Sequence, residues 1–404
     1  MAEGFASAGF VPIAHVEADQ GAANTLRTRE AFHRLNKDGR IDIYRQYLAG
    51  LKKRDELYDE AGINQSSSVI NETISTESLP KLFERIDSLC EGLAPDIIIG
   101  GPPCQAYSLV GRARSENGMI GDQRNFLFLY YAEFLKRYRP AVFLFENVLG
   151  LLSAKDAQGE SYLEHMAKVF GDIGYTVEWS VLDAQEYGVP QARRRVIITG
   201  RLGKRGASIP EPREAAVARQ LNDVIGDLPA IKAGQGMPFS TRLDRAPSQW
   251  LRKAGLLSDD GCVSWHQARP HNERDLQIFS RVVSKWEQGR ERLSYPELPS
   301  HLKTHKNQHS FVDRFKVVAG DLPSSHTIVA HIAKDGNYYI HPDNRQNRSL
   351  TPREAARIQT FPDDFHFESS SGKPSRSAAF KQIGNAVPVI LARCLAEHLR
   401  DHVL

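Results

Sequence analysis

Residues 1–201 alternate short apolar runs, rich in β-branched residues, with longer segments whose apolar residues recur at helical spacing. This alternation predicts a mostly parallel, doubly wound α/β sheet with helices on its faces. The expected strands are FVPIAHVEAD (10–19), DIIIGG (96–101), AVFLFENV (141–148) and RRVIITG (194–200), and the expected helices are NFLFLYYAEFLKRY (125–138) and SYLEHMAKVFGDIG (161–174).

The pattern changes at about residue 202. Between 202 and 345 the prolines are scattered and few segments are periodic, and this stretch holds eight of the chain's 14 histidines. Its 21 lysines and arginines exceed its 16 aspartates and glutamates by five. We therefore predict a smaller, mildly basic domain at 202–345 that is inserted into a larger domain formed by 1–201 and 346–404.

The last part of the chain returns to helical periodicity. RSLTPREAARIQTFPDDF (348–365) and KQIGNAVPVILARCLAEHLRDHVL (381–404) are predicted to be helical, with Pro352 and Pro388 in first turns, where the missing N–H of proline costs little. The segment SSHTIVAHIAKDGNYYIHP (324–342) alternates as strands do. NQSSSVINETISTES (64–78) is expected to be a polar loop or a strand edge.

Composition narrows the class of protein. With 404 residues, 41% hydrophobic and 25% charged, the chain can bury one large core or two domains. It has no apolar run of about 18 residues and no secretory signal pattern, so we expect a soluble cytoplasmic protein without a membrane contact. The net charge of +3 neither requires nor excludes a polyanionic partner.

Cysteine usage points to chemistry at one thiol. Cys90, Cys104, Cys262 and Cys394 are widely spaced and form no Cys-x-x-Cys pair, which argues against a disulfide framework or a zinc site. Cys104 lies in the rigid turn GGPPC that follows a predicted strand. A buried cysteine is usually an inert, small hydrophobic residue, so only the residues around Cys104 can indicate that it is catalytic.

Two further predicted strands supply those neighbours. Glu146 ends AVFLFENV, and ligands of open α/β sheets bind beyond the carboxyl ends of strands, so Glu146 and Cys104 are expected in one cleft. In YGVPQARRRVIITG (187–200), Arg193, Arg194 and Arg195 lie where a strand begins, and alternation would place Arg193 and Arg195 on one face. Alone, Glu146 could be a capping carboxylate, and the arginines a solvated strand edge.

Taken together, these segments resemble the C5-cytosine DNA methyltransferases. GGPPCQAYSLVGR is similar to the family's Pro-Cys-Gln motif, FENV to its Glu-Asn-Val motif and QARRRV to its Gln-x-Arg-x-Arg motif. RSLTPREAARIQTFPDDF is similar to the ninth block and KQIGNAVP to the tenth. The five motifs occur in the family's order, and the resemblance covers residues 1–201 and 325–404.

The resemblance implies covalent catalysis on cytosine. Cys104 would add to carbon 6 of the ring, so that carbon 5 becomes nucleophilic enough to accept a methyl group. Glu146 would contact or protonate N3, and Arg195 with Arg193 would orient the base and its O2. The target base would be extruded from the duplex, under a loop carrying Gln105, Ser108 and Arg112.

The methyl donor implied is S-adenosylmethionine. Glu17, at the end of a predicted strand, matches the position that holds the ribose hydroxyls, although an ordinary loop carboxylate is the simpler interpretation. The family's adenine-binding aspartate has no clear counterpart, since VINETIS offers only Asn71 and Glu72. The other matching positions are Pro103, Leu127, Asn385, Ala386 and Val387.

Residues 202–345 are similar in position to the target-recognition domain of the family, and double-stranded DNA is the expected partner. His301, His305 and His309 have the spacing of one helix face, which raises a metal site as an alternative. No carboxylate or cysteine accompanies them, so we expect no metal. We expect a monomer, paired functionally with a restriction endonuclease that acts on the same site.

Other hypotheses remain open at this point. A tRNA cytosine methyltransferase would use the same catalytic residues, but the chain lacks the Cys-Phe-Thr signature of that branch. A cysteine hydrolase would need a histidine that the motifs around Cys104 do not provide. The family usually begins with a strand and a Phe-x-Gly-x-Gly turn, whereas this chain starts at MAEGFASAGF; the first strand is therefore expected to be missing, and an impaired DNA-binding relic is an alternative.

Overall fold

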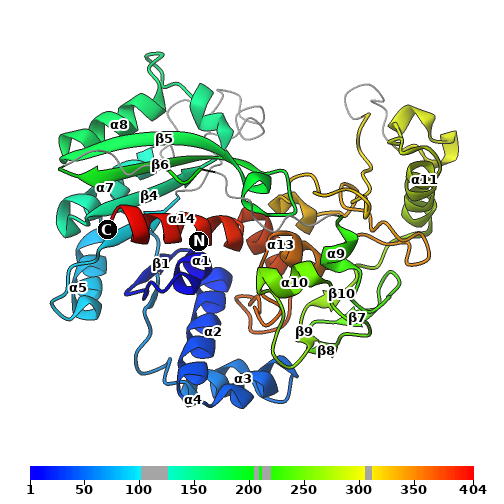
Figure 1. Ribbon diagram of the computed structural model, residues 1–404, viewed down its shortest axis with the longest axis horizontal. Coiled ribbons are helices and arrows are strands. Elements are labelled where there is room, and N and C mark those ends of the chain that lie inside the picture. Colours follow the sequence, from blue (N-terminus) through cyan, green and yellow to red (C-terminus); the bar gives the residue numbers. More distant parts are fainter. Residues whose placement is uncertain (102–125, 204–208, 212–219, 305–311) are drawn as a thin grey trace.

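The structure is a computed structural model of the chain and describes residues 1–101, 126–203, 209–211, 220–304 and 312–404. Figure 1 shows its helices and strands. The strands are β1 (His15–Glu17), β2 (Val69–Asn71), β3 (Ile97–Gly100), β4 (Val142–Asn147), β5 (Tyr175–Asp183), β6 (Arg194–Leu202), β7 (Gly236–Met237), β8 (Thr241–Arg242), β9 (Cys262–Val263) and β10 (His266–Gln267). The α-helices are α1 (Ala2–Ser7), α2 (Gln20–Lys37), α3 (Ile41–Leu48), α4 (Arg54–Glu60), α5 (Leu79–Cys90), α7 (Leu127–Tyr138), α8 (Tyr162–Asp172), α9 (Asn222–Ile225), α10 (Gln249–Ala254), α11 (Glu273–Gly289), α12 (Pro352–Ile358), α13 (Arg376–Asn385) and α14 (Val389–His402).

The largest sheet of the described residues has the strand order β3-β4-β6-β5. β3 and β4 run parallel, as predicted, but β6 runs antiparallel to both β4 and β5. The predicted mostly parallel sheet is therefore wrong for this half. The connection from β5 to β6 is too short for a parallel crossover, so the two strands form a hairpin.

β1 and β2 form a second, two-stranded parallel sheet. In the described part of the chain no ladder joins β1 or β2 to β3. Strands β1 and β3 are only half-buried, because all their residues are intermediate in exposure. By contrast, β4 is buried at every position except Glu146. The α/β sheet is thus divided between these two parts.

Several local expectations differ from the structure. β2 lies within the stretch expected to be a polar loop or strand edge, and the edge strand β5 was not predicted at all. The alternating segment 324–342 forms only isolated bridges and the 3₁₀ helix η6 (Ala330–Ala333), because it runs between other elements and pairs with no continuous strand. Pro352 is the first residue of α12 as predicted, but Pro388 caps α14 rather than beginning it.

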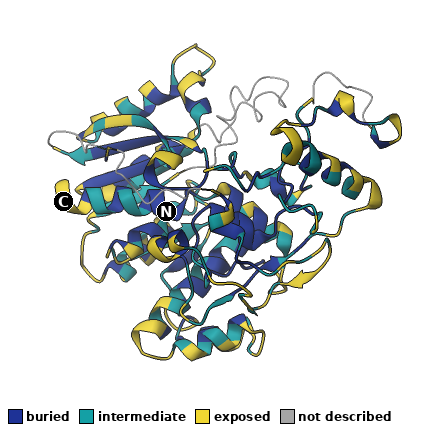
Figure 2. Cartoon of the chain, turned by 45° about the vertical axis from the view of Figure 1, so that its right-hand side comes forward, coloured by how far each residue is buried: buried dark blue, intermediate teal, exposed yellow. Residues whose placement is uncertain are grey.

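The inserted region shares its core with the rest of the chain. One cluster of buried side chains contains residues of β4 and β6 together with Leu221–Leu228, Trp250–Trp265 and the helices α12 to α14. A separate core lies under α11, built from Ile278, Phe279, Val282 and Val283 with residues of 293–315 and Ile340. Figure 2 shows buried residues continuous through the centre of the molecule, while α11 stands apart. No helix of the described residues is long and apolar enough to cross a membrane.

Gly200 tests how tightly the central sheet is packed. It lies opposite Phe143, and a Cβ there would be 2.0 Å from a carbon of the Phe143 ring. Gly200→Ala should lower the free energy of unfolding by roughly 1–3 kcal/mol because the buried ring must move. Urea denaturation of the whole chain measures this change.

Gly171 in α8 is the matched control, since a Cβ there meets nothing within 4 Å. Gly171→Ala should be neutral or stabilising by up to about 1 kcal/mol, because alanine favours a helix. Equal effects of the two substitutions would contradict the packing argument.

Candidate functional site

Two charged side chains meet where β4 ends and β6 begins. Nε of Arg195 lies 2.8 Å from Oε1 of Glu146, and both side chains are largely buried. The antiparallel register places Glu146 opposite Ile197 and Asn147 opposite Val196, so the end of β4 lies beside the start of β6. The pair therefore follows from strand pairing between segments that are about 50 residues apart.

The segment that leads to Cys104 starts against this pair. A Cβ at Gly101 would be 2.8 Å from the carbonyl oxygen of Glu146 and 3.2 Å from its Oε2, so only glycine allows this approach. The Tyr131 hydroxyl donates to the carbonyls of Ile98 and Leu144 and ties β3 to β4. Cys104 and Pro103 lie outside the described residues.

Asn147 is a site residue that the sequence reasoning did not single out. Its Oδ1 accepts from the N–H of Val148, and its buried Nδ2 has no hydrogen-bond partner in the described structure. A buried donor without an acceptor is costly, which is one mark of a group kept for a ligand or a moving segment. Its position directly after Glu146 was the available signal.

Arg193 does not accompany Arg195. Its guanidinium is buried and donates to the carbonyl of Ile328 at 2.6 Å and to that of Gly384 at 3.0 Å. Gly384 is needed there, since a Cβ would be 2.2 Å from the backbone nitrogen of Ala330. Arg193 thus holds α13 and η6 together, while Arg195 faces Glu146.

Two glutamines extend this connection, and sequence reasoning missed both. Gln191 donates from Nε2 to Oε1 of Gln359 and accepts from the N–H of Ile328. Gln359 in turn donates to the carbonyl of Ile383. The segments 191–195, 328, 359 and 383–386 are therefore joined by buried hydrogen bonds, which no local pattern in the sequence indicates.

The residues expected at the cofactor lie near the ends of β1 and α13. Oε1 of Glu17 accepts from the N–H of Asp19, and Asp19 pairs with Lys381 at 2.8 Å. Asn385 is exposed one turn beyond Lys381, so α13 presents both residues on the same side. Leu127 is half-buried at the start of α7, Ala386 caps α13 and is half-buried, and Val387 is buried.

Residues 80–401 match the sequence profile of the family described as C-5 cytosine-specific DNA methylase. The chain belongs to this family. It is a methyltransferase that acts on carbon 5 of cytosine in DNA, of the type found in restriction–modification systems, and its family uses S-adenosylmethionine.

Named relatives agree with this assignment. The chain is 38% identical to the type II methyltransferase M.Bpa9945I of Bacillus paralicheniformis, over 99% of this chain and 96% of that protein. It is 31% identical to the type II methyltransferase M.DdeI of Desulfomicrobium norvegicum, over 83% of this chain and 78% of that protein.

A solved structure shows the same fold. A putative DNA modification methyltransferase encoded within an E. coli prophage superposes with a TM-score of 0.62 at 20% identity, over 99% of this chain and 95% of that one. The α/β methyltransferase fold is therefore confirmed for this chain.

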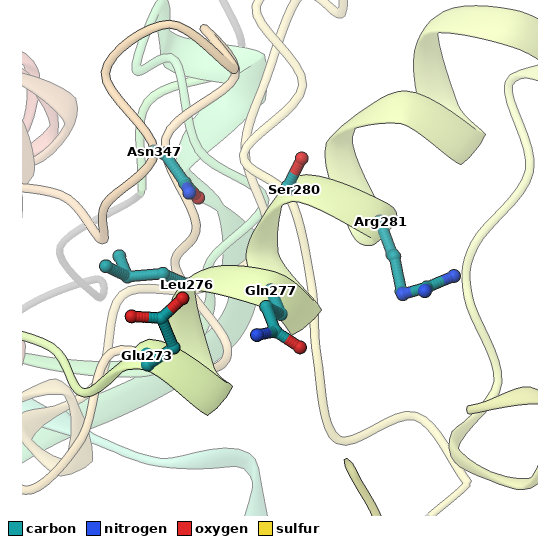
Figure 3. A pocket seen from close by; sticks show the side chains of 6 residues that line it. All are labelled: Glu273, Leu276, Gln277, Ser280, Arg281 and Asn347. Carbon is teal, nitrogen blue, oxygen red and sulfur yellow. The ribbon is translucent and has the colours of Figure 1, made fainter. Parts of the chain in front are cut away.

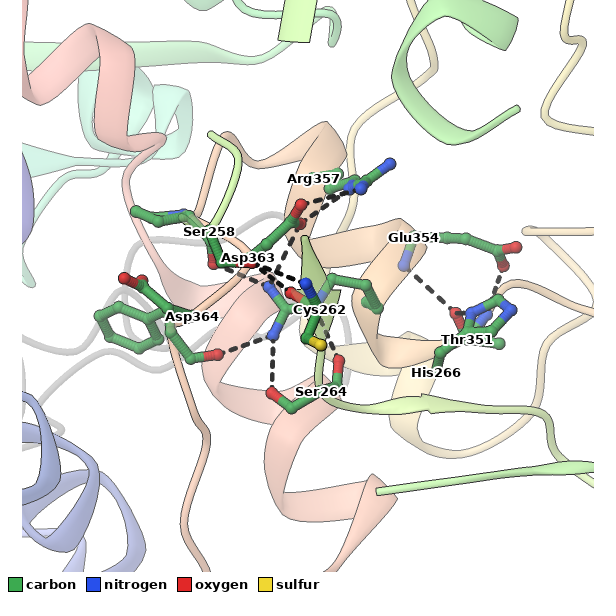
Figure 4. A network of polar contacts seen from close by, with 12 residues as sticks. Ser258, Cys262, Ser264, His266, Thr351, Glu354, Arg357, Asp363 and Asp364 are labelled. Carbon is green, nitrogen blue, oxygen red and sulfur yellow. Dashed lines mark hydrogen bonds and ion pairs between the residues drawn. The ribbon is translucent and has the colours of Figure 1, made fainter. Parts of the chain in front are cut away.

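A buried polar network around α12 anchors the methyltransferase core (Figure 4). Arg357 is fully buried and pairs with Asp363 at 2.8 Å and with Asp227 from the inserted region. Arg348 forms two hydrogen bonds, of 2.7 and 2.8 Å, with the carboxylate of Glu354. Arg348 and His341 hold the pKa of Glu354 well below its ordinary value, although burial opposes them.

The described residues contain no group of His, Cys, Asp or Glu that could hold a metal ion. His301 lies in the short 3₁₀ helix Ser300–Leu302, and His305 and His309 lie outside the described residues. The α-helix face that the spacing of the three histidines suggested as an alternative is therefore not formed at His301. Cys90, Cys262 and Cys394 form no disulfide among the described residues.

His341 should make the stability of the methyltransferase depend on pH. Burial and Arg348 lower its pKa to about 4, against the partial compensation of Glu354 and Asp343. Below pH 6.5 His341 of the unfolded chain binds a proton, whereas His341 of the folded chain stays neutral until about pH 4. The free energy of unfolding should therefore fall between pH 6.5 and 4, by up to about 3 kcal/mol from this residue.

Denaturation curves from pH 7.5 to 4 measure this slope. His341→Gln should flatten part of it, because glutamine does not titrate. The same slope in His341→Gln and in the unmodified chain would contradict the assignment.

Proposed function

We propose that this methyltransferase works through a covalent adduct between Cys104 and a cytosine that has been extruded from duplex DNA. The observation that carries the proposal is the Glu146–Arg195 pair, packed against the backbone of Gly101, three residues before the thiol. This arrangement supports a thiol, a carboxyl and a guanidinium acting on one ring.

The proposed sequence uses the three side chains in turn. The Cys104 thiolate adds to carbon 6, and the ring electrons move to carbon 5 while Glu146 donates a hydrogen bond or a proton at N3. Arg195 orients Glu146 and the base, including O2. After carbon 5 has gained the methyl group, a base removes the hydrogen that carbon 5 still carries. The Cys104 thiolate then leaves carbon 6, which restores the aromatic ring.

We assign Arg193 a positioning role in this scheme. Its donors are used by the carbonyls of Ile328 and Gly384, so it acts on the base only through the segments that it holds. The expected loop residues Gln105, Ser108 and Arg112 remain a prediction, since they lie outside the described residues.

The residues of the cofactor side fit S-adenosylmethionine, which when bound supplies an electrophilic methyl group on a sulfonium. The N–H of Asp19 fixes Oε1 of Glu17, and Oε2 has no hydrogen-bond partner among the described residues, so the carboxylate can accept from ribose hydroxyls. Asn385, Ala386 and Val387 are proposed to border the same site, with Leu127 at the start of α7. Pro103 is proposed with them.

We propose that 202–345 is the target-recognition domain and that 1–201 with 346–404 is the catalytic domain. The separate core under α11 supports an independent recognition module within this span. The bonds from Arg357 to Asp227 and from Arg348 to the carbonyl of Ile231 hold the span against the ninth block. A monomer that shares its DNA site with a restriction endonuclease completes the proposal.

Cys104→Ser should abolish methyl transfer, because a hydroxyl is too weak a nucleophile to form the adduct. Binding to duplex DNA should remain within a few-fold, since phosphate contacts carry most of the affinity. Incorporation of a labelled methyl group and a gel-shift titration measure the two properties.

Glu146→Gln should reduce the rate by about 10²–10⁴, the usual share of a general acid or base. Glu164→Gln, an exposed change on α8, is the control and should leave the rate unchanged.

Full methyl-transfer activity of the Cys104→Ser variant would contradict the covalent mechanism.

The divided sheet supports a further proposal about the 404-residue chain. In the described part of the chain no ladder joins the β1-β2 sheet to β3, which leaves few backbone donors beside Glu17, so affinity for S-adenosylmethionine should be low. Calorimetric titration of the 404-residue chain measures this affinity. Binding as tight as that of M.Bpa9945I in the same buffer would overturn the proposal.

A further inference from the structure

An open cavity of about 560 Å³ lies along one face of α11, and neither Glu146 nor Arg195 lines it. Glu273, Leu276, Gln277, Ser280 and Arg281 line it at successive turns, and Asn347 lines it from the loop before α12. Figure 3 shows Asn347 on its own loop, across from the helix. The opposite face of α11 is buried in the separate core, so the helix is held by one face and open on the other.

The polar groups around this cavity are not used within the described structure. Glu273, Gln277, Ser280 and Arg281 make no side-chain hydrogen bond or ion pair there. Arg281 has no carboxylate partner among the described residues, whereas five nearby cations do. These are Arg274 with Asp275, Lys285 with Glu297, Arg290 with Asp321, Arg292 with Asp313 and Arg345 with Asp343.

Asn347 is the second, independent observation. Its backbone has φ +40°, a left-handed conformation that side chains other than glycine adopt rarely, and its Oδ1 is buried without a hydrogen-bond partner. Asparagine adopts this backbone conformation more readily than most residues, so the unsatisfied buried acceptor is the observation that needs an explanation such as a ligand.

The loop that carries Asn347 is fixed in place. Asn344 donates to the hydroxyl of Ser284 on α11, and the adjacent Arg348 is held by Glu354 and by the carbonyl of Ile231. Asn347 therefore keeps one position relative to α11 before any ligand binds. Such preorganisation lowers the cost of binding.

We infer that this face of α11, together with Asn347, recognises base edges of the DNA target and thereby sets the sequence that is methylated. Arginine pairs with guanine, and glutamine and asparagine pair with adenine, through two hydrogen bonds each, while a carboxylate accepts from the amino group of cytosine. Arg281 and Glu273 are both unpaired among the described residues, so the face offers a donor fork and a carboxylate acceptor for base edges. The inference rests on the proposed function of 202–345 and names the residues that would perform it.

Selection of bound duplexes from a random DNA library, followed by sequencing, tests this inference with the full chain. Gln277→Ala, Arg281→Ala and Asn347→Gly should each lose discrimination at one or two positions of the selected sequence, by roughly 5- to 150-fold, the range for one lost pair of base contacts. Glycine at 347 accepts the backbone conformation, so the last variant removes only the side chain.

Arg274→Ala is the matched control, because Arg274 is exposed on the same helix, outside the cavity lining, and already paired with Asp275. It should weaken binding to all duplexes alike and leave the selected sequence unchanged. An unchanged sequence in all three cavity variants would overturn the inference, and so would an unmodified chain that selects no sequence.

Methyl transfer to the selected duplexes is measured in parallel and keeps the two proposals separate. A chain that selects a sequence through these residues but transfers no methyl group supports the inference and contradicts the catalytic proposal. A chain that methylates one sequence equally well with and without the three side chains contradicts the inference and supports the catalytic proposal.

Discussion

The burial of three arginines, two within α12 and one just before it, constrains more of this structure than any other interaction. Arg348, Arg353 and Arg357 are completely buried, and a guanidinium without water must find carbonyl or carboxylate acceptors for its donors. Arg353 obtains them from the carbonyls of Ser264, Pro362 and Phe365, and Arg357 from Asp227 and Asp363. Removing one partner of such a pair typically costs about 3–5 kcal/mol, because the remaining charge stays buried.

These contacts set the relative positions of the functional parts. The acceptors come from the inserted region and from the chain on either side of α12, so the region 227–264 cannot shift without leaving a charge unpaired. Arg348 in addition holds the loop of Asn347 against the inserted region through Ile231. On the other side, Gln359 follows α12 directly and connects it to Gln191 and α13. Buried hydrogen bonds thereby connect the segment just before Arg195 with the loop that carries Asn347.

Part of the fold and the site could be predicted because the signals are local. The apolar runs ending in Gly101 and Glu146 are long enough to identify β3 and β4, and strand direction then places their ends together. β2 was foreseen only as a polar loop or strand edge, because it is three residues long in a polar stretch, and β5 was missed because it is a partly exposed edge strand. The buried hydrogen bonds of Gln191 and Gln359 have no periodicity and could not be foreseen.

The sequence by itself determined the family, the order of the motifs and the types of side chain that the chemistry needs, since these depend on neighbouring residues. The tertiary structure decided which of those side chains face each other. Alternation along a strand places Arg193 and Arg195 on the same face. Yet the guanidinium of Arg193 donates to the carbonyls of Ile328 and Gly384, while that of Arg195 pairs with Glu146. The acceptors that separate them come from segments more than 130 residues away, and only the packing of η6 and α13 on the start of β6 brings them there.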